Sequence, residues 1–222
     1  MNEILLIIEI VAMFSMLLPA KKMFGKAGLF VWISIASIVA NIQVIKSVVL
    51  FGMDATLGNV LFASNFLATN ILNECYGEKE AKKGVNIGLF AVVVYLLCSQ
   101  VSLLFIPSAI DVAHESMQSL FTIAPRVCLA SVTMFYLSNL IDVKLYSKLR
   151  ARYGEGRMWL RNNISTIVCN SLENFGFAFL AFAGHYSIED VLAIGLSTSI
   201  IETVIAICDT PFLYVAKYKI KN

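Results

Sequence analysis

The chain has 222 residues, of which 59% are hydrophobic and only 14% are charged. In ordinary soluble domains about a quarter of all residues are charged. The composition of this chain therefore argues against a water-soluble fold and predicts an integral membrane protein. The formal net charge of +2 is too small for a nucleic-acid-binding surface, and we expect no nucleic-acid partner.

Several apolar segments are long enough to cross a lipid bilayer as α-helices. About twenty helical residues span the roughly 30 Å of hydrocarbon in a membrane. We therefore predict an all-α integral membrane bundle of six to seven transmembrane helices, with seven favoured, in a single domain over residues 1–222. In chain order, the segments are residues 4–20, 29–51, 57–75, 85–106, 124–149, 162–183 and 190–216.

The basic residues indicate how these segments are oriented. Cytoplasmic loops of membrane proteins are enriched in Lys and Arg. Of the 17 basic residues, 15 lie around or after the ends of the first, third, fifth and seventh segments. This pattern predicts an outside N-terminus and a cytoplasmic C-terminus, and it requires the asparagine-rich third segment to cross. The basic residues on the predicted cytoplasmic side are Lys21, Lys22, Lys26, Lys79, Lys82, Lys83, Lys144, Lys148, Arg150, Arg152, Arg157, Arg161, Lys217, Lys219 and Lys221.

Three local features refine this picture. The first segment lacks a basic region before it and a cleavage pattern after it, so we expect a retained helix rather than a secretory signal. Residues 108–122 on the outer side are expected to form a short interfacial helix. Pro211 is expected to kink the last segment, because proline removes one helical hydrogen bond.

Charged and amide side chains are frequent inside the predicted segments. Such groups are costly in lipid and are functional candidates by default, although many only join helices, contributing about 0.6–2 kcal/mol each. Their helical spacing places several on shared faces, which predicts a central polar cavity that binds the substrate. The candidate substrate-binding residues are Asn41, Gln43, Lys46, Asn70, Glu74, Asn139, Asp142, Asn170, Glu173, Asn174, Glu202 and Asp209.

The chemistry of these side chains favours a flat, purine-like base as the small-molecule partner. A carboxylate such as Glu173 accepts two adjacent hydrogen bonds, and an amide such as Asn170 both donates and accepts. Aromatic side chains, such as Phe177 in the same segment, can stack on a planar ring. A guanine-like heterocycle offers this combination of donors, acceptors and faces.

Neither an enzyme nor a metal site is expected. The five cysteines are spread singly through apolar segments, without the paired spacing of zinc or disulfide frameworks. His114 and His185 both map to outer loops, so they cannot complete a buried catalytic or metal-binding group. The chain also lacks a phosphate-binding loop for ATP. We therefore predict no cofactor and no resident metal.

Several motifs resemble the queuosine precursor transporter family, which is also called the vitamin uptake transporter family. The most specific stretch runs from Phe66 to Gly77 and contains Glu74-Cys75-Tyr76-Gly77, with Lys79 and Lys82 after it. The resemblance spans nearly the whole chain. Further matches are Ala40–Gln43 with Lys46, Arg126 with Ala130-Ser131, Asn139–Asp142 with Lys144, Asn170–Glu173 with Phe177, and Thr210-Pro211 with Tyr214.

The resemblance implies import of 7-deazaguanines, namely the cyano and aminomethyl precursors of queuosine or queuine itself, for tRNA modification. It also implies a bacterial inner-membrane location and a helical fold similar to vitamin-binding S-components. Asn70 and Glu173 stand where the family often has Asp, which bears on substrate choice. The leading mechanism is a secondary carrier or facilitator, and the alternative is a substrate-binding subunit that needs a separate ATP-driven module. A homodimer is also left open.

Overall fold

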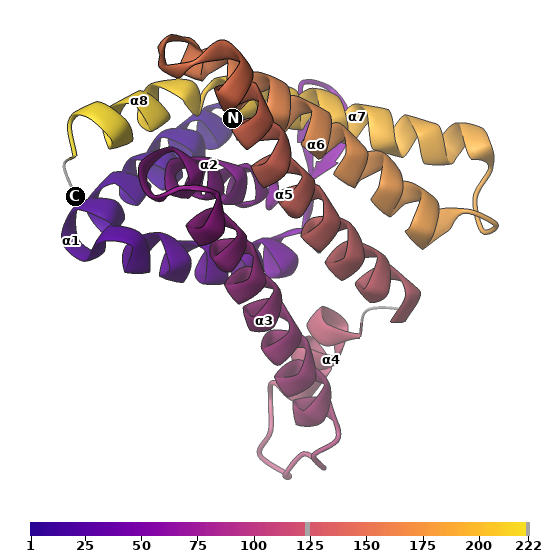
Figure 1. Ribbon diagram of the computed structural model, residues 1–222. Helices are drawn as coiled ribbons and strands as arrows, with labels where there is room; N and C mark the ends of the chain where they lie inside the picture. The colour runs from indigo at the N-terminus through magenta and orange to yellow at the C-terminus, as the bar shows by residue number, and fades with distance from the viewer. Residues whose placement is uncertain (123–124, 221–222) are drawn as a thin grey trace.

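The protein folds into a bundle of helices that carries one small β-hairpin (Figure 1). The computed structural model describes residues 1–122 and 125–220. Residue 124, the expected start of the fifth segment, and Lys221 lie outside them. The elements are α1 Asn2–Gln43, β1 Ser47–Leu50, β2 Met53–Thr56, α2 Asn59–Tyr76, α3 Glu78–Leu103, α4 His114–Phe121, α5 Pro125–Tyr153, the 3-10 turn η1 Glu155–Arg157, α6 Met158–Phe182, α7 Ile188–Ile207 and α8 Thr210–Tyr218.

The prediction of an all-α membrane bundle is confirmed. Five helical stretches of the described chain are long and apolar enough to cross a membrane: α1, α3, α5, α6, and α7 together with α8. The protein is therefore a multi-pass membrane protein. The short helix expected in residues 108–122 is α4. The Asp111 carboxylate precedes it and accepts hydrogen bonds from the backbone N–H groups of Ala113 and His114 at 2.7 Å each. These two bonds lower the pKa of Asp111.

The helix α1 is bent into two antiparallel arms at Gly25, which has φ 58° and ψ −135°. The start of the first arm lies beside the hairpin that follows the second arm, because the Asn2 side chain donates to the Val49 carbonyl at 3.0 Å. The two arms correspond to the first two predicted segments (Figure 1).

The second predicted segment was too long, because the helix ends at Gln43 and residues 47–56 form an antiparallel hairpin. The β-branched Val48 and Val49 favour a strand. Gly52, with φ 77°, adopts the positive φ that the tight turn needs. An apolar run of this kind does not separate a helix end from a short strand by its periodicity.

The asparagine-rich helix α2 occupies the middle of the bundle. It contacts α1, α3, α5, α7 and α8, and fifteen of its 18 residues, from Asn59 to Glu74, are buried. α2 is not one of the five apolar stretches found in the described chain. A helix surrounded by other helices needs no lipid-facing apolar stripe, so amides are tolerated on it where they find protein partners.

The helical hydrogen bonding of the last predicted segment is interrupted next to Pro211, as expected, although Cys208 and Asp209 keep right-handed helical backbone angles. α7 ends at Ile207 and α8 begins at Thr210. Pro211 has no N–H, so the Ile207 carbonyl loses its i+4 donor. The backbone carbonyl of Asp209 then starts α8 by accepting from the N–H groups of Phe212 at 3.0 Å and Leu213 at 3.2 Å.

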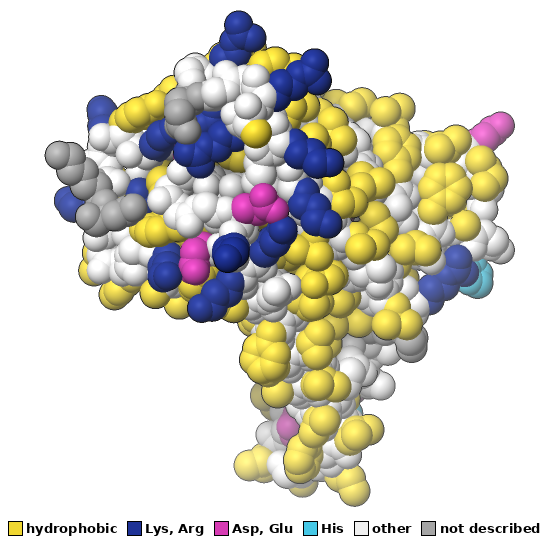
Figure 2. Space-filling view, viewed as in Figure 1, with side chains coloured by type: hydrophobic (Ala, Val, Ile, Leu, Met, Phe, Trp, Pro, Cys, Tyr) yellow, Lys and Arg dark blue, Asp and Glu magenta, His cyan; other side chains and the backbone are white. Residues whose placement is uncertain are grey.

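The charged side chains separate along the bundle. Figure 2 shows Lys and Arg gathered at the end of the molecule formed by the C-terminus of α5, the start of α3 and α8, with apolar side chains over much of the remaining surface. We call this the basic end. Arg126 is at the opposite end, where it caps α6 by donating to the carbonyls of Leu180 and Ala183, at 2.7 Å each.

Gly58 supplies a test of the packing between α1 and α2. Its φ is 97°, and an added Cβ would lie 2.8 Å from the Ala40 carbonyl oxygen. We expect Gly58→Ala to lower the free energy of unfolding by about 1–2 kcal/mol for the left-handed backbone and by about 1–3 kcal/mol more for the clash. Denaturant unfolding in detergent micelles measures the difference.

The matched control for this variant is Gly52→Ala. Gly52 has φ 77° but nothing within 4 Å of its added Cβ, so this variant introduces backbone strain without a clash. Equal destabilisation by the two substitutions would contradict the close contact between α1 and α2.

Candidate substrate cavity and polar clusters

One cavity of about 420 Å³ lies among the helices and is lined by residues of six of them, α1, α2, α3, α5, α6 and α7. Its volume falls in the range of about 300–1,000 Å³ typical of small-molecule sites. The lining includes Asn41 near the end of α1, Asn59 at the start of α2, Val127 near the start of α5 and Phe182 at the end of α6. The cavity therefore lies in the half of the bundle away from the basic end.

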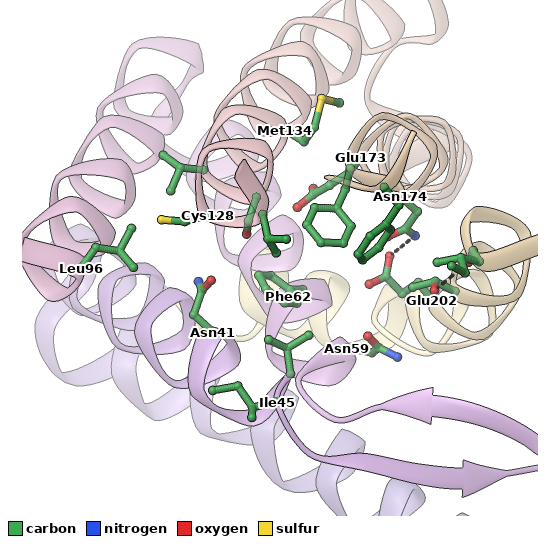
Figure 3. A pocket seen from close by; sticks show the side chains of 18 residues that line it. Asn41, Ile45, Asn59, Phe62, Leu96, Cys128, Met134, Glu173, Asn174 and Glu202 are labelled. Carbon is green, nitrogen blue, oxygen red and sulfur yellow. Dashed lines mark hydrogen bonds between the residues drawn. The ribbon is translucent and has the colours of Figure 1, made fainter. Parts of the chain in front are cut away.

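Two carboxylates from neighbouring helices face this cavity (Figure 3). Glu173 on α6 accepts a hydrogen bond from the Ser138 hydroxyl at 2.5 Å. Glu202 on α7 accepts from the Asn174 amide at 2.7 Å. Among the described residues, no Lys, Arg or His lines the cavity. The wall is thus acidic, and it is suited to a ligand that brings hydrogen-bond donors or positive charge.

The remaining walls combine amides with aromatic rings. Asn41 donates one N–H of its Nδ2 to the Ser37 carbonyl at 2.8 Å, which leaves its oxygen and its second N–H for a ligand. Asn59 is on the same side of the cavity as Glu202 in Figure 3. Aromatic rings on α2 and α6 supply flat apolar surface on which a planar ligand can stack. They are Phe62, Phe177 and Phe182.

Four of the residues expected to bind substrate line this cavity: Asn41, Glu173, Asn174 and Glu202. Asn59, Phe62 and Phe182 also line it and were not among those candidates. Asn59 sits at the start of a buried helix next to the hairpin, and only the fold reveals that it faces the cavity.

A second group of polar side chains is buried between the cavity and the basic end. We call it the aspartate cluster, and it consists of Asn70, Asp142, Asn162, Thr166 and Asp209. Asn70 donates its Nδ2 to the Asn162 amide oxygen at 3.0 Å and to the Thr166 hydroxyl at 3.1 Å. Asn162 donates in turn to Asp209 Oδ1 at 2.5 Å. Asp142 on α5 lies beside Ser165 of α6 and near Asp209. The cluster therefore joins α2, α5, α6 and the junction between α7 and α8.

A third group surrounds Glu74 at the basic end, and we call it the Glu74 network. The Arg161 guanidinium donates to both carboxylate oxygens of Glu74 at 2.8 Å, and the Tyr146 hydroxyl donates to Oε2 at 2.8 Å. Lys217 on α8 also pairs with Glu74. The side chains of Glu74 and Arg161 are fully buried, so one carboxylate ties α2 to α5, α6 and α8.

Four other expected residues lie elsewhere, and none of them is among the described residues that line the cavity. Lys46 is exposed next to the β-hairpin, and Gln43 is half-buried near the end of α1. Asn139 donates to the Phe135 carbonyl of its own helix at 2.8 Å, and Asn170 is buried. The polar residues expected in one central chamber thus form three separate groups.

No group of three or more His, Cys, Asp or Glu residues in the described chain could hold a metal ion. The five cysteines are free thiols, and they range from buried Cys169 to exposed Cys98 and Cys208.

Comparison with known proteins gives a consistent set of relatives. Residues 56–216 match a family model described as "Putative vitamin uptake transporter". A protein of Bacillus subtilis (strain 168) named "Probable queuosine precursor transporter" is 41% identical over 202 residues, which cover 90% of this chain and 88% of the relative. A protein of the same name from Haemophilus influenzae is 24% identical over 143 residues, 64% of this chain and 57% of that one. No solved structure matches the chain significantly.

The Glu74 network predicts a large energetic effect of a single substitution. Arg161→Met would leave the fully buried Glu74 carboxylate with Lys217, Tyr146 and the more distant Arg150 at 3.9 Å, but without the guanidinium that donates to both of its oxygens. Removing one member of a buried ion pair costs about 3–5 kcal/mol, and we expect a loss near the lower end of that range. Equilibrium unfolding in detergent measures it.

The control for this prediction is Lys82→Ala, which removes the more exposed ion pair with Glu78 on α3. Exposed pairs contribute at most about 1 kcal/mol. If both substitutions changed the unfolding free energy equally, the Glu74 network would not hold the basic end together.

Proposed function

The chain belongs to the vitamin uptake transporter family, and from that premise we propose that it transports queuosine precursors. The name shared by its Bacillus subtilis and Haemophilus influenzae relatives supports this assignment. The cavity supports it independently, because two carboxylates and an aromatic wall suit a planar base rich in donors. The observation that carries the proposal is that Glu173 and Glu202 line the same cavity. No basic side chain is among the described residues that line it.

The chemistry of a 7-deazaguanine matches these walls. Its ring N–H and amino group are adjacent donors, which one carboxylate can accept side by side. We assign this contact to Glu173, with Phe177 and Phe182 as the stacking surface. The aminomethyl precursor also carries a positive charge, which Glu202 and Asn174 are placed to receive.

We further propose that the protein sits in the bacterial cytoplasmic membrane with its basic end inside the cell. The enrichment of Lys and Arg at that end supports this orientation. The cavity then lies in the outer half of the membrane. The aspartate cluster and the Glu74 network lie between it and the cytoplasm. This arrangement corresponds to a carrier that receives its ligand from outside and is closed on the inside.

We propose that the protein acts as a carrier on its own and not as an enzyme. The chain has no phosphate-binding loop for ATP, so any ATP-driven uptake would need a separate module. Uptake of a labelled precursor into liposomes that contain only this protein tests the point directly. A requirement for an added ATP-driven module would replace the carrier with a substrate-binding subunit.

Glu173→Gln tests the proposed contact with the base. Hydrogen bonds to a charged group contribute about 1.5–3 kcal/mol, so losing the carboxylate should weaken binding of the precursor about 10- to 100-fold. Binding of labelled cyano and aminomethyl precursors to the purified protein measures this change. Queuosine content of tRNA in cells that lack de novo synthesis reports the same loss in vivo.

Glu189→Gln is the matched control, because Glu189 is an exposed carboxylate in the first turn of α7, outside the cavity. It should bind and transport like the wild type. Wild-type affinity in Glu173→Gln would remove Glu173 from the binding site.

A further inference from the structure

The aspartate cluster contains more buried hydrogen-bond acceptors than donors. Four of its side-chain oxygens have no hydrogen-bond partner among the described residues: both carboxylate oxygens of Asp142, Oδ2 of Asp209 and Oδ1 of Asn70. All three side chains are fully buried. Ser165, which lies beside Asp142, donates its hydroxyl to the Asn162 carbonyl at 3.4 Å. Buried polar groups are normally paired, so this concentration of unused acceptors calls for a ligand.

The cluster also contains negative charge without a protein counterion. Asp142 and Asp209 are near enough to repel each other, and neither takes part in an ion pair within the described chain. The nearby Glu74 network uses its basic residues on Glu74 instead. Asp209 is partly compensated by the Asn162 amide at 2.5 Å, whereas Asp142 has beside it, among the described residues, only the neutral hydroxyl of Ser165. Two buried carboxylates that lie close together without a basic partner require a bound cation or a proton.

The break between α7 and α8 leaves one backbone oxygen without its helical donor next to Asp209. Asp209 lies in that break, and Pro211 leaves the Ile207 carbonyl without its helical donor. In secondary transporters, coupling cations bind where a helix is broken and its C-terminal carbonyls are unsatisfied. The break and the unpartnered acceptors are separate observations that point to one location.

We propose that the aspartate cluster binds a Na⁺ ion whose gradient drives transport. A shared proton would satisfy only two of the four unused oxygens, one as its carrier and one as its acceptor. A Na⁺ ion binds several oxygens at once, and the carboxylate, amide and hydroxyl groups here are oxygen ligands. The ion would bridge α5 to the junction of α7 and α8. The binding site follows from the cluster alone, whereas its role in coupling rests on the proposed transport function.

Binding of ²²Na⁺ to the purified full-length protein, with choline chloride holding ionic strength constant, tests the site without any substrate. We expect saturable binding to the wild type and to the Glu189→Gln control. Asp142→Asn and Asp209→Asn should each weaken it at least 10-fold. Gel filtration and thermal unfolding establish that each variant is folded, and two variants are used so that misfolding of one leaves the other informative. Absent wild-type binding, or undiminished binding in a folded variant, overturns the site.

Liposome uptake tests the coupling. An inward Na⁺ gradient should accelerate accumulation of labelled precursor, an equal K⁺ gradient should not, and Asp142→Asn should lose the acceleration. Uptake that follows a proton gradient and ignores Na⁺ overturns the coupling while leaving the transport function intact. Na⁺ binding without uptake under any gradient supports the site and rejects the transport function.

Discussion

A bilayer interior supplies no water, so every polar side chain inside the bundle needs a partner that the protein itself provides. This constraint explains why α2 is central. It carries Asn65, Asn70, Asn73 and Glu74 inside the bundle, and each of these side chains has a hydrogen bond to another helix. A lipid-facing helix with this sequence would leave those groups unsatisfied.

The cavity, the aspartate cluster and the Glu74 network differ in how many of their polar atoms have a hydrogen-bond or ion-pair partner within the protein. The Glu74 network is saturated, since one carboxylate receives Arg161, Lys217 and Tyr146. The aspartate cluster is only half satisfied. The cavity leaves Glu173 and Glu202 open to a ligand. Under the proposed function, the saturated group holds helices together, whereas the open groups bind the substrate and the coupling ion. In that proposal, the degree of hydrogen-bond satisfaction separates structural from functional polar residues.

These groups are stacked along the axis of the bundle. The cavity lies away from the basic end, the Glu74 network lies at it, and the aspartate cluster lies between them. Asn162 and Thr166 of the cluster and Glu173 of the cavity share α6, and Asp209 follows α7, which carries Glu202. A movement of α6 and α7 against α2 would alter all three groups together, which is the coupling that alternating access requires.

The sequence by itself determined the membrane class, the order of the helices and the basic end, because these depend on composition and on residues within one helix length. It also predicted that Asn70, Asp142 and Asp209 are polar residues of a central cavity. Only the tertiary structure decided that these three meet in their own cluster, that Glu74 forms an ion pair with Arg161, and that residues 47–56 form a hairpin. Helical spacing fixes which residues share a face, but the partner of each face is set by packing between segments far apart in the chain.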